Sequence, residues 1–202
     1  MIIEVVGIPG AGKSTISQML ADRLDLAWRE LNLDGRERHR ARLAGLITQP
    51  RMLLGLASRI RHDRVGPAIS AILHLTGRSF VQRRLSDTVV DSGPVFTASV
   101  ALVNGAPNVT PALLAKWLPN PDLIVHLHQS PEVAARRVIE RGRFTPYTEA
   151  QLVERFDSYE HHLKALVELL PCERMVVDVG DLTPEEVTDR CLDLLRTQGG
   201  SR

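Results

Sequence analysis

The sequence predicts an α/β fold in which helices cover both faces of a parallel β-sheet. Two observations carry this prediction. Short apolar runs alternate with helical patterns along the chain, and the first run leads directly into a glycine-rich loop. The runs that we expect to form strands are residues 2–6, 27–31, 88–90, 123–127 and 175–179. Strands of a parallel sheet are buried on both faces and read as continuous apolar runs, as these do.

The composition is that of one globular domain spanning residues 1–202. Hydrophobic residues make up 44% and charged residues 24% of the chain, which excludes a disordered or low-complexity protein. The 25 basic and 24 acidic residues give a net charge of +1, so bulk charge supports neither a nucleic-acid polymer nor a membrane surface as a partner. The oligomeric state is left open, with a homodimer as one candidate.

Targeting and redox signals are weak. Two cysteines, Cys172 and Cys191, are too few for a disulfide framework, and no signal-peptide pattern opens the chain. The longest uncharged stretch, residues 92–115, contains three prolines and is a poor membrane span. We therefore expect a cytoplasmic protein with reduced thiols.

Several helix starts are marked by a hydroxyl residue followed by proline, because the hydroxyl caps the helix and proline suits its first position. These pairs are Thr110-Pro111, Ser130-Pro131 and Thr183-Pro184. Residues 35–84 have a helical pattern throughout, with breaks near Gln49-Pro50 and Gly66-Pro67. We interpret this segment as a helical insertion over the carboxyl edge of the sheet rather than a second domain.

The strongest signal is GIPGAGKST at residues 7–15, which matches the phosphate-binding pattern G-x-x-x-x-G-K-S between an expected strand and an expected helix. Lys13 is expected to reach the β- and γ-phosphates of ATP, and Ser14 to ligate Mg²⁺. The alternative is a glycine-rich turn with an incidental Lys-Ser pair. The residues expected to hold the nucleotide are Gly7, Pro9, Gly10, Ala11, Gly12, Lys13, Ser14 and Thr15.

A missing motif and the short chain exclude two classes of nucleotide-binding protein. A GTPase carries a guanine-recognition motif [NT]-K-x-D, but the other lysines, Lys116 and Lys164, follow Ala115 and Leu163. The chain is also short for a motor or AAA-type ATPase. A small phosphotransferase remains.

Three segments resemble known kinases. GIPGAGKST resembles the phosphate loop of adenylate kinases and of thymidylate-kinase-like and deoxynucleoside-kinase-like families. Residues 121–127 (PDLIVHL), 130–133 (SPEV) and 136–143 (RRVIERGR) resemble the fourth strand, the following helix and the arginine-rich lid of thymidylate-kinase-like proteins. The resemblance implies a three-layer P-loop NTPase fold with a five-stranded parallel sheet of order 2-3-1-4-5. It also implies ATP as donor, a lid at 136–147 and acceptor binding by the insertion at 35–84.

The lid arginines carry like charges on shared helix faces, which destabilises an isolated helix and which a bound anion would relieve. The resemblance implies that Arg136 or Arg137 packs against adenine, while Arg141 and Arg143 close over the transferring phosphoryl group. A solvated basic helix face is the alternative.

Carboxylates are expected at the carboxyl ends of two strands, where ligands gather in open α/β sheets. Asp91 is a candidate for the Mg²⁺ shell or for orienting the acceptor hydroxyl, with a turn or capping role as the alternative. Near the second strand, Asp34 is a better candidate than Glu30 for a general base, and it could also cap the next helix. His126 and His128 alternate on one strand, but no third metal ligand is evident.

The leading hypothesis is a Mg²⁺- and ATP-dependent kinase of a nucleoside or nucleoside monophosphate. Ser92 stands where the related nucleotide kinases usually have arginine after the aspartate, so a non-nucleotide alcohol such as a sugar or antibiotic is the alternative acceptor. A non-catalytic ATP-binding module and a phosphosulfate-using sulfuryl transferase are rivals from other classes.

Residues 36–84 hold eleven arginines against Glu37 and Asp63, a net charge of +9, which suggests an anionic acceptor or a solvated basic surface.

Overall fold

The computed structural model describes residues 1–31, 35–51, 65–104, 109–142 and 147–199. Two residues that the sequence singled out, Asp34 and Arg143, lie outside the described residues, as do residues 52–64 of the expected insertion.

Five parallel strands form one sheet in the order β2-β3-β1-β4-β5, which confirms the predicted α/β fold and strand order. The strands are β1 (Ile2–Val6), β2 (Ala27–Glu30), β3 (Thr88–Asp91), β4 (Leu123–His128) and β5 (Glu173–Asp178). The third strand extends to Asp91, one residue beyond the apolar run. The candidate acid is therefore the last residue of β3 and still belongs to the sheet.

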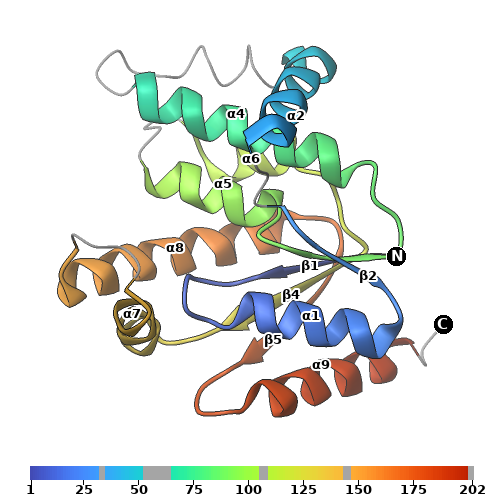
Figure 1. Cartoon of the computed structure of the whole chain (residues 1–202), viewed down its shortest axis with the longest axis vertical. Helices are drawn as coiled ribbons and strands as arrows, with labels where there is room; N and C mark the ends of the chain where they lie inside the picture. Colours follow the sequence, from blue (N-terminus) through green and yellow to red (C-terminus); the bar gives the residue numbers. More distant parts are fainter. Residues whose placement is uncertain (32–34, 52–64, 105–108, 143–146, 200–202) are drawn as a thin grey trace.

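Helices form a layer on each face of the sheet (Figure 1). Their bounds are α1 (Lys13–Leu24), α2 (Gly35–Thr48), α4 (Val65–Gln82), α5 (Pro94–Val103), α6 (Pro111–Ala115), α7 (Pro131–Glu140), α8 (Glu149–Leu169) and α9 (Pro184–Gly199). Helices α1 and α9 pack together on one face, while α4, α5 and α8 cover the other and α2 lies against α4.

The three predicted helix starts are confirmed. The hydroxyls of Thr110 and Ser130 accept hydrogen bonds from the third residue beyond them. Thr183 and Glu186 exchange two bonds in a capping box. The break expected near Gln49-Pro50 is the end of α2. The break expected near Gly66-Pro67 falls at the start of α4, whose first turn holds both residues; helix N–H groups there have no partner for proline to remove.

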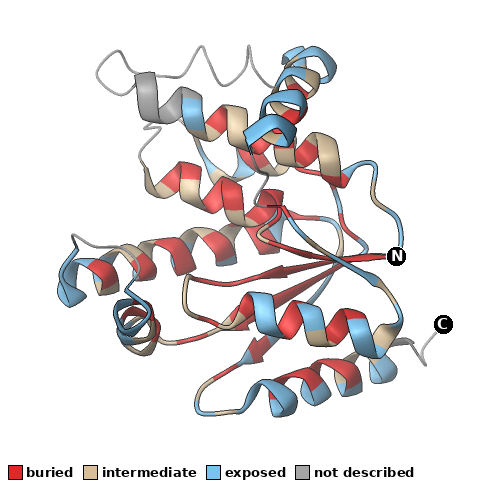
Figure 2. Cartoon of the chain, viewed as in Figure 1, coloured by how far each residue is buried: buried red, intermediate tan, exposed pale blue. Residues whose placement is uncertain are grey.

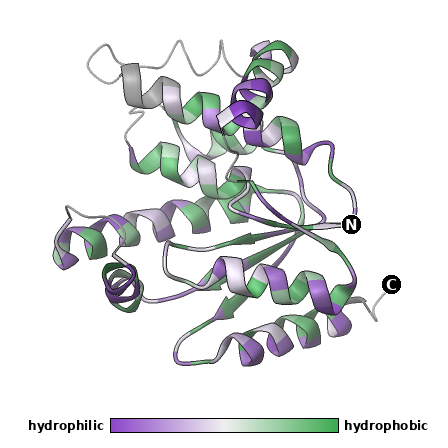
Figure 3. Cartoon of the chain, viewed as in Figure 1, coloured by the Kyte–Doolittle hydropathy of each residue, from purple (hydrophilic) through white to green (hydrophobic). Residues whose placement is uncertain are grey.

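The core lies between the sheet and the two helical layers (Figure 2). Strands β1, β3 and β4 are almost wholly buried, whereas the edge strands β2 and β5 keep exposed residues. Hydropathy follows the same division, with apolar residues on the central strands and polar residues on the outer helix faces (Figure 3). Within the described ranges, no helix has the length and apolarity needed to cross a membrane.

Candidate active site

The loop between β1 and α1 curls because two of its glycines adopt left-handed backbone angles. Gly10 has φ 91° and Gly12 has φ 85°, a region that side-chain-bearing residues rarely adopt. A Cβ atom at Gly10 would also lie 2.7 Å from the carbonyl oxygen of Ala134. Gly12 is the N-cap of α1 and supplies no side-chain cap, so the first N–H groups of the helix remain available to an anion.

Lys13 is buried at the start of α1, beside the loop. Its ammonium group donates a hydrogen bond to the carbonyl oxygen of Ile8 at 3.0 Å and lies 4.7 Å from the ring centroid of Phe96. Burial lowers the pKa of Lys13 to about 8, and the nearby Asp91 carboxylate opposes that shift. A phosphate bound in the loop would supply the negative charge that this buried cation lacks.

Ser14 and Asp91 meet at the ends of α1 and β3. The Ser14 hydroxyl donates to Asp91 Oδ2 at 2.5 Å, and the Ser92 hydroxyl donates to Asp91 Oδ1 at 3.1 Å. A hydroxyl and a carboxylate are hard oxygen donors that suit Mg²⁺, which usually takes its other ligands from phosphates and water. The two residues that the sequence proposed as Mg²⁺ ligands are therefore neighbours.

One cavity of about 350 Å³ joins the phosphate loop to the insertion. Glu30 from β2 and Arg78 from α4 line it together with Lys13 and Ser14. The sequence favoured Asp34 over Glu30 as a base; the structure places Glu30 in this cavity, whereas Asp34 is not described.

Arg78 is a site residue that the sequence did not single out. Its guanidinium group donates to the carbonyl oxygen of Ser92 at 2.9 Å and to the Thr97 hydroxyl at 2.6 Å. Burial lowers the pKa of Arg78, while the charges of Glu4, Asp91 and Glu30 oppose this shift. Its only signal in the sequence is membership of the arginine-rich segment.

The arginines of α7 and its C-cap residue Arg141 differ in the cavities that they line. Arg141 lines the cavity described above, and it also lines a smaller one of about 150 Å³ together with Arg137 and the loop before α9. Arg136 is exposed and lines neither cavity. Of the pair proposed to contact adenine, Arg137 is therefore the better placed.

The basic charge of the insertion is divided as well. His74 Nε2 lies 2.5 Å from the guanidinium group of Arg42. Burial and the charges of Arg42, Arg78 and Arg38 lower the pKa of His74 to about 4, so its neutral ring accepts the bond. A separate groove of about 720 Å³ between α2 and α4 is lined by the exposed residues Arg36, Arg40 and Arg84. Only part of the excess charge therefore lies near the phosphate-loop cavity.

His126 and His128 join β4 to α8 through Glu160. Their ring nitrogens lie 3.2 Å and 2.7 Å from its carboxylate oxygens. Burial alone would raise the pKa of Glu160, but the hydrogen bonds and charges of the two histidines outweigh it and lower the pKa. Over the described ranges, no group of three His, Cys, Asp or Glu side chains is arranged to hold a metal.

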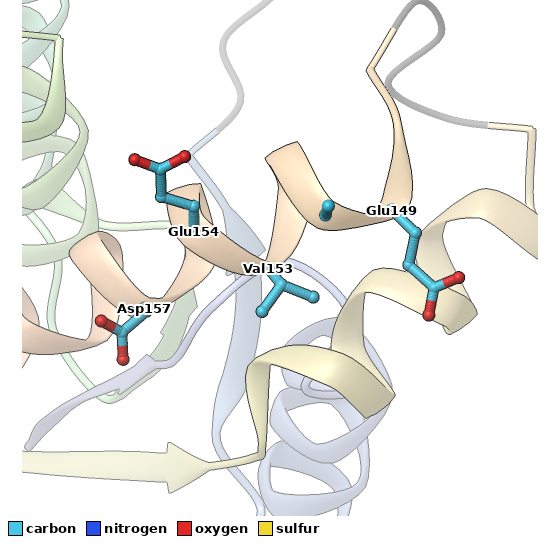
Figure 4. Close-up of a pocket in the computed structure, with 5 residues that line it drawn as sticks. Glu149, Val153, Glu154 and Asp157 are labelled. Carbon is cyan, nitrogen blue, oxygen red and sulfur yellow. The ribbon is translucent and has the colours of Figure 1, made fainter.

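A shallow hollow of about 650 Å³ lies along the first turns of α8. Its carboxylates belong to Glu149, Glu154 and Asp157, and Figure 4 shows them pointing away from one another around Val153. Diverging side chains do not converge on a ligand, so this hollow adds no chemistry to the site.

The phosphate-loop cavity therefore brings Lys13 and the N–H groups at the start of α1 together with Glu30 and Arg78. A P-loop kinase uses such donors to bind a nucleotide and hold an acceptor beside it. The family model of thymidylate kinase matches residues 5–190, so the chain belongs to the thymidylate kinase family and is an ATP-dependent kinase. None of the curated proteins matches the sequence.

Solved structures share the fold at low sequence identity. Deoxyadenosine kinase from M. mycoides with bound dATP is 21% identical, with a TM-score of 0.62 over 97% of this chain and 100% of that one. YorR protein from Bacillus subtilis in complex with phosphorylated GDP is 13% identical, with a TM-score of 0.60 over 100% and 99% of the two chains. Shikimate kinase from Acinetobacter baumannii in complex with shikimate is 16% identical, with a TM-score of 0.55 over 98% and 93%.

Proposed function

We propose that this kinase transfers the γ-phosphoryl group of Mg²⁺-bound ATP to a hydroxyl or phosphate of a nucleoside or nucleoside monophosphate. The observation that carries the proposal is that Lys13, Ser14, Glu30 and Arg78 line one cavity. Groups that suit the donor phosphates and the acceptor thus line one cavity, as direct transfer requires. Membership of the thymidylate kinase family and the likeness to a deoxyadenosine kinase support this acceptor class.

On the donor side, the N–H groups of residues 10–14 and the ammonium group of Lys13 bind the β- and γ-phosphates. Ser14 and Asp91 are the residues that would hold Mg²⁺, which neutralises phosphate charge when it is bound. Arg141 lines the larger cavity and is proposed to contact the transferring group, and Arg137 lines the smaller cavity and is proposed to contact the nucleotide base. Arg143 is proposed to act with Arg141 on sequence grounds.

On the acceptor side, Glu30 is the one carboxylate among the described residues that line the cavity, and it pairs in register with Asp91 across β2 and β3. We propose that it accepts the proton of the attacking hydroxyl. Asp34 and Asp91 remain the other candidates for this base. The cations Arg38, Arg42 and Arg78 act together on His74, and this concentration of charge favours an acceptor that carries a negative group.

A non-nucleotide alcohol is the second candidate acceptor. Ser92 offers only a short side chain that is already bonded to Asp91, where a nucleotide kinase of this type usually presents arginine. A small hydroxy acid would use Arg78 instead, and a shikimate kinase shares this fold.

An acceptor panel tests the proposal. ADP formation from ATP and Mg²⁺ would be measured with deoxynucleosides, nucleoside monophosphates, sugars and hydroxy acids, and the products identified by ³¹P NMR. We expect acceptor-dependent ADP with a nucleoside or nucleotide, no turnover in Lys13→Ala, and normal turnover in the control Lys116→Ala, whose side chain is exposed. ATP binding without transfer to any acceptor would indicate a non-catalytic module. Transfer from phosphosulfate, with ATP as a mere competitor, would indicate a sulfuryl transferase.

A further inference from the structure

Helix α5 begins without a cap of its own. Its N-cap residue is Gly93, which has no side chain, and its first residue is Pro94, which has no N–H group. The next two N–H groups, of Val95 and Phe96, both donate to the carboxylate of Glu4, and the bond from Val95 measures 2.9 Å. A residue in the middle of β1, 91 positions earlier in the chain, thus replaces the missing cap.

The Glu4 carboxylate is fully buried, and its surroundings are built around it. Gln82 on α4 donates to its second oxygen at 3.1 Å. A Cβ atom at position 93 would lie 2.5 Å from the Glu4 carboxyl carbon, so the absence of a side chain at Gly93 is what admits the carboxylate. Burial raises the pKa of Glu4 to about 7, against the lowering effects of its hydrogen bonds and of the Arg78 charge.

The partner amide suits both charge states of Glu4. The Nε2 atom of Gln82 donates to the ionised carboxylate, while its Oε1 atom is buried and has no hydrogen-bond partner among the described residues. Rotation of this amide by half a turn would let Oε1 accept a hydrogen bond from the O–H group of neutral Glu4. Among the described residues, the other ionisable groups that act on Glu4 are Arg78 on α4 and the thiol of Cys172 before β5; burial raises the pKa of this thiol.

The capped turn carries two parts of the active site. It runs from Asp91, which binds Ser14, through Ser92, whose φ of 57° is left-handed, to Phe96, which lies against Lys13. A left-handed serine persists only where its surroundings hold it. The cap on α5 and the bond from Arg78 to the Ser92 carbonyl are the contacts that do so.

We propose that Glu4 is a positioning residue for phosphoryl transfer: its ionised carboxylate caps α5 and thereby fixes Asp91 and Phe96 against the phosphate loop, and its protonation loosens this turn. Glu4 touches neither the phosphate-loop cavity nor any reacting atom, so it acts through the turn. The proposal depends on phosphoryl transfer but not on the identity of the acceptor.

Titration followed by NMR tests whether the charge state of Glu4 controls the structure of the capped turn. The side-chain carboxyl carbon of Glu4 and the amide groups of Val95, Phe96 and Ser92 should shift together, with one midpoint near pH 7. In Glu4→Gln the amide shifts should disappear, whereas in Glu168→Gln, an exposed control on α8, they should persist. A Glu4 midpoint near its ordinary value, or amide shifts that survive in Glu4→Gln, would overturn the proposal.

The pH profile of ADP formation tests whether the charge state of Glu4 affects phosphoryl transfer. The profile is measured with the best acceptor of the panel or, if none reacts, with slow transfer of the phosphoryl group to water. We expect the wild-type kcat to rise severalfold along the Glu4 titration. Glu4→Gln should lack that rise and retain the low-pH kcat, with an unchanged KM for ATP. An unchanged rise in the variant, or a loss confined to KM, would overturn the proposal.

A rescue separates capping from general stability. Glu4→Ala removes the cap and should lower kcat, and adding Gly93→Ser places a local capping hydroxyl in the space vacated by the carboxylate. Position 93 has φ −71° and ψ −168°, which serine adopts without strain at an N-cap. We expect the double variant to recover most of the lost kcat and to show no titration near pH 7. If the double variant is no more active than Glu4→Ala, the cap is not what matters and the proposal fails.

Discussion

The hydroxyl of Ser14 donates a hydrogen bond to the carboxylate of Asp91 at 2.5 Å, although 77 residues separate them in the chain. The parallel register of β1 and β3 brings the phosphate loop and the end of β3 to the same edge of the sheet. A shared metal ligand set at this edge is therefore a property of the fold as much as of the two residues.

Asp91→Asn tests this pair. The amide oxygen can still accept from Ser14, so the geometry is retained while the negative charge is lost. We expect the Mg²⁺ dependence of ATP binding, measured by calorimetry with and without EDTA, to weaken sharply, and kcat to fall by roughly two orders of magnitude. Binding of metal-free ATP should change little. If the variant keeps the full enhancement of ATP binding by Mg²⁺, Asp91 does not belong to the metal shell.

Lys13 predicts a pH limit on nucleotide binding. Burial lowers its pKa to about 8, and only the protonated form attracts phosphate. ATP affinity should therefore fall as the pH rises above 8, by up to about tenfold per unit. Lys13→Met should bind ATP weakly at all pH values and show no such fall. The comparison of Kd between pH 7 and 9.5 removes the contribution of the nucleotide's own titration, because both proteins share it.

Lys13 could be identified as a site residue from the sequence, whereas Arg78 could not. The loop motif is local, since its glycines, lysine and serine lie within nine positions, and its structural role follows from that spacing. The strands and their order were likewise predictable from apolar runs and the kinase resemblance. Arg78 is one of eleven arginines in its segment, and only the packing of α4 against α5 selects it.

Glu4 marks a second limit of sequence reasoning. A lone glutamate in an apolar strand gives no sign of its partners, because the helix that it caps begins about 90 residues later. The structure places Glu30 in the cavity and does not describe Asp34, so which of them acts as the base stays a prediction. Contacts between distant segments, rather than local propensity, decide such roles.

Glu4 also predicts a stability profile. Its folded-state pKa of about 7 exceeds the ordinary value of 4.5, so the folded protein binds this proton more tightly than the unfolded chain does. The stabilisation from protonated Glu4 is complete below pH 4.5 and is lost as the pH rises through 7, a change on the order of 3 kcal/mol. Urea unfolding of wild type and Glu4→Gln across this window should give a difference that grows with pH in favour of the variant. Parallel profiles for the two proteins would show that Glu4 titrates normally.

Arg78→Met should affect the acceptor more than the donor. The guanidinium group lies on the acceptor side of the cavity, and its loss removes a positive charge and two hydrogen bonds. For an anionic acceptor we expect KM to rise about 30-fold, which corresponds to roughly 2 kcal/mol for a charged hydrogen bond, with a smaller change in KM for ATP. The matched control is Arg83→Met on the next turn, since Arg83 is exposed and bonds to the carbonyl oxygen of Trp117. Equal effects of Arg78→Met on anionic and neutral acceptors would contradict the charge argument.

Substitutions of Arg136 and Arg137 on α7 and of its C-cap residue Arg141 should differ in their kinetic effects. Arg137 lines only the smaller cavity, so Arg137→Ala should raise KM for ATP while largely sparing kcat. Arg141 lines both cavities, and a group that contacts charge developing in the transition state acts on kcat; Arg141→Ala should lower kcat by about 10²-fold or more. Arg136→Ala is the control, because its exposed side chain lines neither cavity. Steady-state kinetics at saturating acceptor distinguishes the three variants, and equal losses in all of them would mean that α7 contributes only a diffuse positive field.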